Sequence, residues 1–369
     1  MTERFQSRTL FRLTVISAFL VTLIVLVTVV PVTAQVDVSD KSNEQQPEGT
    51  LAKYLSFYGT GRADWAVLTI GATGTPITWK IRKNQAGPEV SSTFNFGVVG
   101  DVISPGSYTG DVTFDPAIWR SVAGANAQTW IDPFDNGAGT PYTVIPFGTA
   151  GDNAARNGDY DGDGIEDVAI IRIVGGVLQW WIRPSSNPTA ARVVNFGTTL
   201  ANNSLFAFEG ADFTGDGRDE LVLARVLNLT GATTWYVGDA VTGAQINQVQ
   251  WGNFNTDFLI NPADYSGDGR ADYAVWRAGG TGPDARVWYI INGATGQQLP
   301  PVWFGIGDPN FTDNDLPIRG DYDGDGIHDI AVFRPTTNTF WVLASSNSNL
   351  IVQQWGATDD VPLGNFFTF

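Results

Sequence analysis

The sequence predicts an all-β fold, a β-propeller of six four-stranded blades, from three observations. A segment close to DYDGDGxxDxAVxR recurs at Asp159, Asp212, Asp264 and Asp321, with spacings of 53, 52 and 57 residues. Between these copies, short runs rich in Val, Ile, Trp, Tyr and Phe alternate with Gly, Asn, Asp and Pro, and no amphipathic helical stretch interrupts them. Each unit ends in an aromatic residue followed by glycine. Units of about 50 residues that hold four short strands are typical of propeller blades.

The number of blades depends on two weaker copies and on the end of the chain. Degenerate copies lie at residues 56–64 and 107–115, so six units tile residues 50–356. Residues 360–366 then resemble the strand that opens each unit. We expect this extra strand to pair with the first blade, because ring closure removes exposed sheet edges. Residues 51–57 compete for the same place, and a seven-bladed ring is the alternative.

Within each unit we expect four strands in a fixed order. In the sixth unit, the first strand (residues 316–322) precedes an acidic loop and the second (residues 329–334) follows it. The third strand carries a tryptophan at equivalent places, which inter-blade packing requires: Trp79, Trp130, Trp180, Trp235, Trp288 and Trp341. The second strand ends in an arginine in five units, and we expect these to be structural partners of the acidic loops: Arg120, Arg172, Arg225, Arg277 and Arg334. Four other tryptophans are the better candidates for a surface site: Trp65, Trp119, Trp181 and Trp303.

The acidic loops predict metal sites. Positions 1, 3, 5 and 9 of two loops are all carboxylates, namely Asp159, Asp161, Asp163 and Asp167, and Asp321, Asp323, Asp325 and Asp329. Two further loops carry a hydroxyl at position 3 and should bind more weakly, namely Asp212, Thr214, Asp216 and Glu220, and Asp264, Ser266, Asp268 and Asp272. Carboxylates this close repel one another unless a cation lies among them. All-oxygen ligands on a flexible loop favour Ca²⁺ over Zn²⁺ and Mg²⁺, at about four sites of mainly structural role. Solvated turns without metal are the alternative.

With these residues in view, the chain resembles the FG-GAP and VCBS-type repeats of bacterial exported proteins. It is also similar to the calcium-loop blades of the integrin α-subunit propeller. The resemblance is strong in four units, weak in the first two, and covers about residues 50–369. It implies a propeller with Ca²⁺ in the loop between the first and second strands of a blade. It further implies binding of proteins or glycans, and only rarely catalysis.

The N-terminus and the composition bear on where the protein works. Residues 1–34 hold three arginines, an apolar run and a small-residue end, which predicts a secretory signal peptide, with an uncleaved anchor as the alternative. Residues 35–49 are polar and predict a flexible linker before the propeller at 50–369. The chain has no cysteine, so it forms no disulfides. A net charge of −17 would repel phosphate backbones, which makes nucleic acid an unsuitable partner.

These observations favour a non-catalytic binding or adhesion module, monomeric, secreted or displayed at a bacterial cell surface. Its partner would be a cell-surface or matrix protein or a glycan. A carbohydrate-binding lectin is the first alternative, and a polysaccharide-active enzyme the second. The motifs of nucleophilic, zinc and nucleotide chemistry are missing from the sequence. The only histidine, His328, lies in a metal loop, and we interpret the triplet Arg319-Gly320-Asp321, which spells an integrin-binding motif, as an accident of the repeat.

Overall fold

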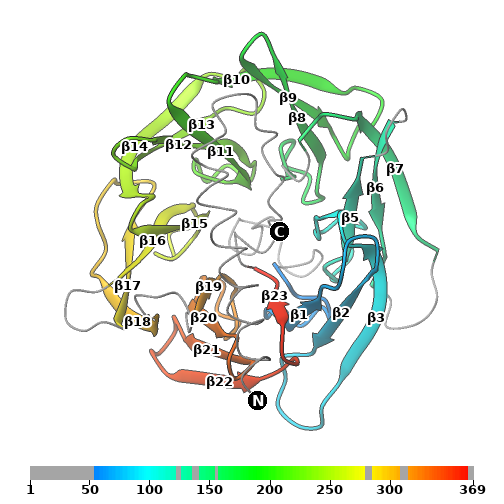
Figure 1. Ribbon diagram of the computed structural model, residues 1–369, viewed down its shortest axis with the longest axis vertical. Helices are drawn as coiled ribbons and strands as arrows, with labels where there is room; N and C mark the ends of the chain where they lie inside the picture. Colours follow the sequence, from blue (N-terminus) through cyan, green and yellow to red (C-terminus); the bar gives the residue numbers. More distant parts are fainter. Residues whose placement is uncertain are drawn as a thin grey trace, which may run out of the picture.

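Six β-sheets stand in a ring around a central axis (Figure 1). The computed structural model describes residues 54–121, 126–134, 141–153, 157–278, 285–307 and 315–364. The predicted signal peptide and linker, residues 1–34 and 35–49, lie outside the described residues. Among the described residues no helix could span a membrane. The fold is therefore the predicted β-propeller, and it has six blades and not seven.

Each blade is an antiparallel sheet that runs outwards from the axis. The first blade contains β23 (Asp360–Pro362), β1 (Trp65–Thr69), β2 (Pro76–Arg82) and β3 (Ser91–Val98), and the second contains β4 (Val102–Ile103), β5 (Ala117–Arg120), β6 (Asn126–Ile131) and β7 (Thr143–Thr149). The third contains β8 (Val168–Val174), β9 (Val177–Arg183) and β10 (Arg192–Thr198), and the fourth contains β11 (Asn203–Ala211), β12 (Glu220–Leu227), β13 (Ala232–Gly238) and β14 (Gln245–Asn253). The fifth contains β15 (Asp257–Ala263), β16 (Asp272–Ala278), β17 (Ala285–Ile291) and β18 (Val302–Ile306), and the sixth contains β19 (Leu316–Ile318), β20 (Ile330–Arg334), β21 (Thr339–Leu343) and β22 (Leu350–Gln354). In the third blade the described residues form two isolated bridges at the innermost position, between Asn153 and Ile171 and between Gly158 and Asp167.

The C-terminal strand closes the ring. β23 pairs antiparallel with β1, with Val67 opposite Pro362, so the innermost strand of the first blade comes from the other end of the chain (Figure 1). Residues 51–57 were the competing candidate. Their described part forms tight turns instead of a strand, with Leu55 buried at a φ of 55°. Closure leaves one place for an innermost strand, and β23 occupies it.

The third-strand tryptophans are not all equivalent. Trp79, Trp180, Trp235 and Trp288 are fully buried. The indole N–H of the first three donates to the carbonyl of the aromatic residue in the aromatic-glycine pair, at 2.9, 3.0 and 3.1 Å. Trp130 and Trp341 are only half-buried, and our prediction of equivalent places was wrong for them. Each lies one residue later in the strand register, and a shift of one residue turns a side chain to the opposite face.

Four of the five second-strand arginines pair with a different set of aspartates from the one we expected. Their partners open the innermost strand at the far end from the acidic loops, in the pairs Asp101–Arg120 at 2.6 Å, Asp152–Arg172 at 2.7 Å, Asp257–Arg277 at 2.5 Å and Asp315–Arg334 at 2.8 Å. Lys80 and Asp360 form the corresponding pair in the first blade, at 2.8 Å. Each guanidinium also lies over an aromatic ring, as Arg172 does over Trp181 at 4.5 Å. These pairs fasten five blades to the turn that enters each of them, and in the fourth blade Arg225 donates to the carbonyl of Thr198 at 2.9 Å instead.

Candidate metal centres

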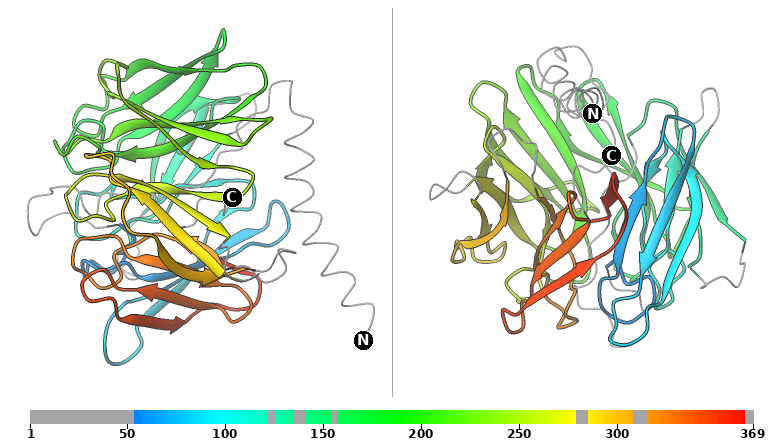
Figure 2. Two further views of the ribbon diagram at one scale, coloured as in Figure 1. Left: turned by 90° about the vertical axis from the view of Figure 1, so that its left-hand side faces the viewer. Right: turned by 60° about the horizontal axis from the view of Figure 1, so that its bottom comes forward.

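In the second to sixth blades the acidic loop lies between the innermost part of the blade and its second strand, and in the first blade the corresponding loop, residues 56–64, precedes β1. The side views in Figure 2 show the blades from their edges, with strands running between the two faces of the ring. Gly162 and Gly164 in the third-blade loop have φ angles of 79° and 83°, which side-chain-bearing residues rarely adopt. The glycines let the backbone curl so that carboxylates two residues apart face the same small volume.

The first carboxylate of each full-length loop holds the loop in shape. Asp159 accepts hydrogen bonds from the backbone N–H of Gly162 at 2.7 Å and of Gly164 at 2.6 Å. Asp212, Asp264 and Asp321 accept the same two bonds in their own loops. All four are buried. The position 1 carboxylate therefore stabilises the loop conformation even without a bound cation.

The ninth carboxylate ties the loop to the turn between the third and fourth strands. Asp167 accepts the backbone N–H of Ser185 at 2.6 Å, and Asp329 accepts that of Ser345 at 2.7 Å. The same turns send serine hydroxyls to positions 3 and 5, as in Ser186 to Asp161 at 2.5 Å. Our reading of the sequence missed these serines. A Ser-Ser-Asn triplet follows the third strand in the third and sixth units, the two with full acidic sets, and this coincidence could have identified them.

Three of the four predicted sets bring carboxylates together. Oxygens within 4.8 Å of one another come from Asp159, Asp161 and Asp167, from Asp212, Asp216 and Glu220, and from Asp321, Asp323 and Asp325. Among the described residues, the fifth-blade set of Asp264, Ser266, Asp268 and Asp272 does not form such a group. There Asn292 donates to Asp268 at 2.7 Å and to Ser266 at 2.9 Å.

The donor atoms of the three groups fit a hard cation. Every ligand atom is oxygen, and oxygen-only sites in flexible loops suit Ca²⁺. Thr214, Asp163 and Asp329 lie in the same loops outside the three groups. Each of these loops could therefore hold one metal ion, with the carboxylates supplying its charge balance.

The six loops also form a closed ring with one another. In all six blades, the backbone N–H at loop position 8 donates to the position 1 carbonyl of the preceding loop: Phe114 to Ser56 at 3.1 Å, Glu166 to Ser107 at 2.8 Å, Asp219 to Asp159 at 2.9 Å, Ala271 to Asp212 at 2.7 Å, His328 to Asp264 at 2.9 Å, and Ala63 to Asp321 at 2.6 Å. Position 1 is thus a loop cap, a candidate ligand and an inter-blade acceptor. A cation held by one loop would stiffen the contact to the next blade.

Burial raises the pKa of several loop carboxyls in the cation-free protein. The pKa of Glu220 rises to about 8, that of Asp272 to about 7 and that of Asp329 to about 6, chiefly because burial penalises the charged form. Neighbouring carboxylates add to the effect, as Asp212 does for Glu220. A bound cation would reverse this preference by favouring the charged form.

These shifts predict a pH-dependent calcium effect. A carboxyl with a raised folded-state pKa stabilises the fold while protonated, so its contribution is complete below about pH 4 and is lost as pH rises through about 6 to 8. In chelator we expect the free energy of unfolding to fall between pH 5 and pH 8.5, by at most about 1.4 kcal/mol per pH unit for each group, and the melting temperature to fall with it. The difference in melting temperature between millimolar calcium and chelator should grow across the same pH range. Paired thermal melts would measure it, and a difference independent of pH would contradict the prediction.

Other residues singled out in the sequence have structural surroundings. His328 is buried, and its ring lies against Tyr54 and Tyr265 with centroids 5.4 and 5.9 Å apart. Arg319 and Asp321 are each 1% exposed, so the Arg-Gly-Asp triplet is inaccessible to an integrin-like partner.

The four candidate surface tryptophans differ in how exposed they are. Trp65 and Trp119 are buried, and Trp65 stacks on Tyr322. Trp181 lies under Arg172. Only Trp303, 52% exposed on β18, remains available at the surface.

The fold and the acidic loops define a six-bladed β-propeller with candidate metal loops. No family model and no curated protein matches this chain. Among solved structures it is similar to the SapL1 lectin in complex with alpha methyl fucoside, at 12% identity over 78% of this chain and 95% of the other, with a TM-score of 0.38. It is similar to the Dos1 propeller at 10% identity over 81% and 78% of the two chains, with a TM-score of 0.40. It is also similar to the periplasmic gluconolactonase PpgL of Pseudomonas aeruginosa, at 11% identity over 79% and 81%, with a TM-score of 0.40. At such identities and TM-scores these similarities carry no argument about function.

Proposed function

We propose that this protein is a calcium-stabilised propeller of the FG-GAP and VCBS type, exported by a bacterium, that acts as a monomeric, non-catalytic binding module. The observation that carries the proposal is the link between three acidic groups and a closed ring of inter-blade hydrogen bonds. Such a ring makes a rigid disc, and a rigid disc holds its surface loops in fixed positions. Its partner would be a protein or glycan at a cell surface or in the surrounding matrix.

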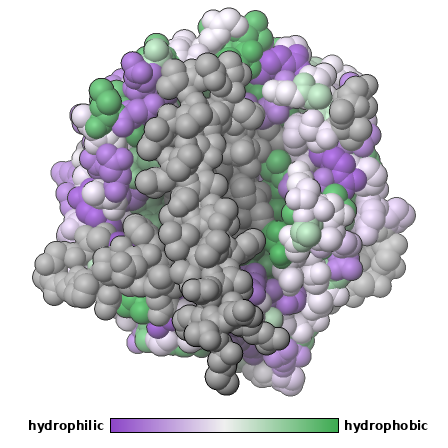
Figure 3. Space-filling model, viewed as in Figure 1, coloured by the Kyte–Doolittle hydropathy of each residue, from purple (hydrophilic) through white to green (hydrophobic). Residues whose placement is uncertain are grey.

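The non-catalytic part of the proposal rests on how the carboxylates are used. General acid and base pairs need carboxyl groups that face a substrate. Here the loop carboxylates are bound to loop backbone, and five others form ion pairs within the blades. On the face seen in Figure 3, hydrophilic residues are spread around the rim between separate hydrophobic ones. This surface favours recognition through polar contacts.

The proposal is tested by binding in two buffers. Purified protein would be applied to a glycan and polysaccharide array and used in pull-downs from cell-surface extracts, in millimolar calcium and in chelator. We expect partner capture in calcium and its loss in chelator, with thermal melts reporting how much fold is lost. Hydrolysis of an array polysaccharide would contradict the non-catalytic assignment. A folded protein that binds nothing in either buffer would contradict the binding function.

A further inference from the structure

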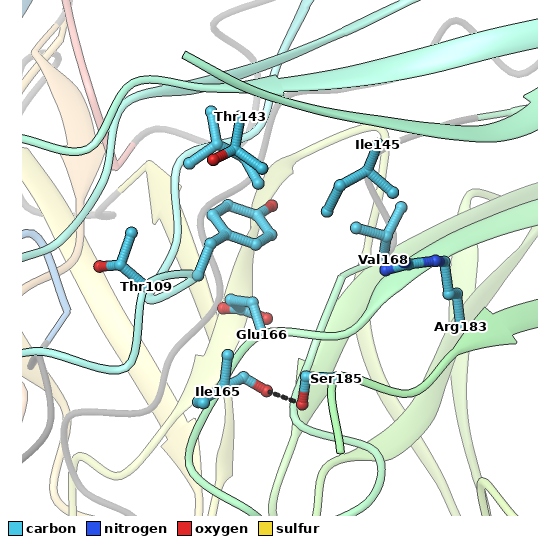
Figure 4. Close-up of a pocket in the computed structure, with 10 residues that line it drawn as sticks. Thr109, Thr143, Ile145, Ile165, Glu166, Val168, Arg183 and Ser185 are labelled. Atoms are coloured by element: carbon cyan, nitrogen blue, oxygen red, sulfur yellow. Dashed lines mark hydrogen bonds between the residues drawn. The ribbon is translucent and has the colours of Figure 1, made fainter. Parts of the chain in front are cut away.

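A pocket lies between the second and third blades (Figure 4). Its volume is about 180 Å³. Ile145 on β7 and Val168 on β8 form apolar walls, and Thr143, Glu166 and Arg183 supply polar groups. Thr109 and Ser185 also line the pocket, and their hydroxyls donate to Asp115 and Asp163. The volume equals that of about six liquid waters. It is smaller than the roughly 300 Å³ at which pockets for drug-sized ligands begin. One ring-sized molecule would fill it.

Among the described residues that line the pocket, Arg183 is the one cation and Glu166 the one carboxylate. The Arg183 side chain is half-buried at the end of β9, and among the described residues it has no ion pair or hydrogen bond. Burial lowers the pKa of its guanidinium, and no carboxylate opposes that shift. Removing a cation from water is costly when no anion compensates for it. This arginine therefore provides a place for an anion that the protein itself does not fill.

Arg82 shows what the same position looks like when it is satisfied. Arg82 and Arg183 each come three residues after a fully buried third-strand tryptophan. Arg82 has Glu89 at 3.7 Å, and its guanidinium lies over the ring of Trp355 at 5.9 Å. In the third blade the corresponding side chain faces the pocket instead. The contrast indicates that packing of the blade alone does not explain why Arg183 faces the pocket.

We propose that this pocket binds a single acidic sugar, a uronic acid, whose carboxylate pairs with Arg183. Guanidinium and carboxylate match in a bidentate geometry, which makes arginine the residue suited to such recognition. The apolar walls suit the C–H face of a sugar ring, and the surrounding hydroxyls suit its hydroxyl groups. An acidic polysaccharide with a terminal uronic acid is the macromolecule that would present it.

Binding should depend on calcium through Ser185. This residue lines the pocket, and its hydroxyl donates to Asp163 at 2.9 Å while its backbone N–H donates to Asp167 at 2.6 Å. A cation in the third-blade loop would hold that wall in place. It would also offset the negative charge of the loop, which otherwise repels an anionic ligand.

Isothermal titration of the purified protein with methyl glucuronide and methyl galacturonide, each beside its neutral parent glycoside, tests the site. In millimolar calcium we expect the uronides to bind at least tenfold more tightly than the neutral sugars. Arg183→Gln should weaken uronide binding at least tenfold, and the matched variant Arg82→Gln should leave it unchanged. Ile145→Trp, which fills the pocket, should abolish binding while the melting temperature shows the variant folded. Equal affinity for neutral sugars, uronide binding unaffected by Arg183→Gln, or no uronide binding by the folded protein would each overturn the proposal.

This site would supply the proposed binding function, yet the two can fail separately. A protein that binds no uronide but captures another glycan or a protein partner overturns this site and leaves the binding function intact. A protein that captures no partner at all, uronide included, overturns both.

Discussion

Arg319→Met is expected to destabilise the propeller by about 3–5 kcal/mol, the cost of breaking a buried ion pair from one side. Arg319 is 1% exposed, and its guanidinium lies 3.6 Å from Glu209 and 2.9 Å from the Tyr54 hydroxyl. It also donates to the carbonyl of Pro262 at 3.1 Å, and its backbone N–H donates to Gly364. The side chain thus joins the fourth and fifth blades to the N-terminal end of the described chain, and the backbone of the same residue holds the C-terminal end. Urea unfolding in millimolar calcium would measure the loss.

A double-mutant cycle separates the ion pair from general packing. Glu209→Gln alone should also destabilise the fold, and in the background of Arg319→Met its further cost should be smaller than in the wild type. Simple additivity of the two substitutions, or an Arg319→Met variant within about 0.5 kcal/mol of the wild type, would show that this residue does not hold the ring together.

Asp321→Asn is expected to remove most of the calcium stabilisation contributed by the sixth blade, in addition to a calcium-independent loss of about 1 kcal/mol from one broken loop hydrogen bond. The two carboxylate oxygens of Asp321 accept the N–H groups of Gly324 and Gly326, one each, at 2.5 and 2.8 Å. The amide keeps one of these acceptors and removes the negative charge. Extracellular calcium sites typically have Kd values near 10⁻⁴ to 10⁻³ M. At about ten times Kd, one site contributes about 1.4 kcal/mol. The difference between melts in calcium and in chelator measures this contribution.

Asp111→Asn is the matched control for that experiment. Asp111 lies in the degenerate loop of the second blade, where its carboxylate accepts bonds from Thr113 at 2.6 and 2.7 Å and where we predict no metal. The stabilisation of this variant by calcium, relative to chelator, should equal that of the wild type. If Asp321→Asn retained the full calcium stabilisation, the sixth-blade loop would not be a calcium site.

The repeat period predicted most of the fold because each blade carries its own copy of the pattern. The sequence did not settle the number of blades or the closing strand, since residues 51–57 and 360–366 both resemble an innermost strand. Only the three-dimensional ring shows that one place exists and that β23 fills it. The one-residue register shift at Trp130 and Trp341 was equally hidden, because a tryptophan at either register fits a strand pattern.

The candidate metal residues were visible in sequence because ligands within one loop are local. Contacts between separate turns and strands of one blade were not visible. The serines that reach Asp161 and Asp163 come from another turn, and the partners of Arg120 and Arg334 lie about 19 residues away in the innermost strand. The pocket beside Arg183 combines two blades, and single-unit patterns carry no information about how neighbouring units face each other.

Calcium binding measured by isothermal titration, beside thermal melts of the same samples, tests the central claim most directly. We expect at least three bound ions, one for each acidic group, and a stabilisation of about 4 kcal/mol at ten times Kd, three times the single-site value. Absence of calcium binding to the folded protein, or binding that leaves the melting temperature unchanged, would contradict the account of this propeller as a calcium-stabilised disc.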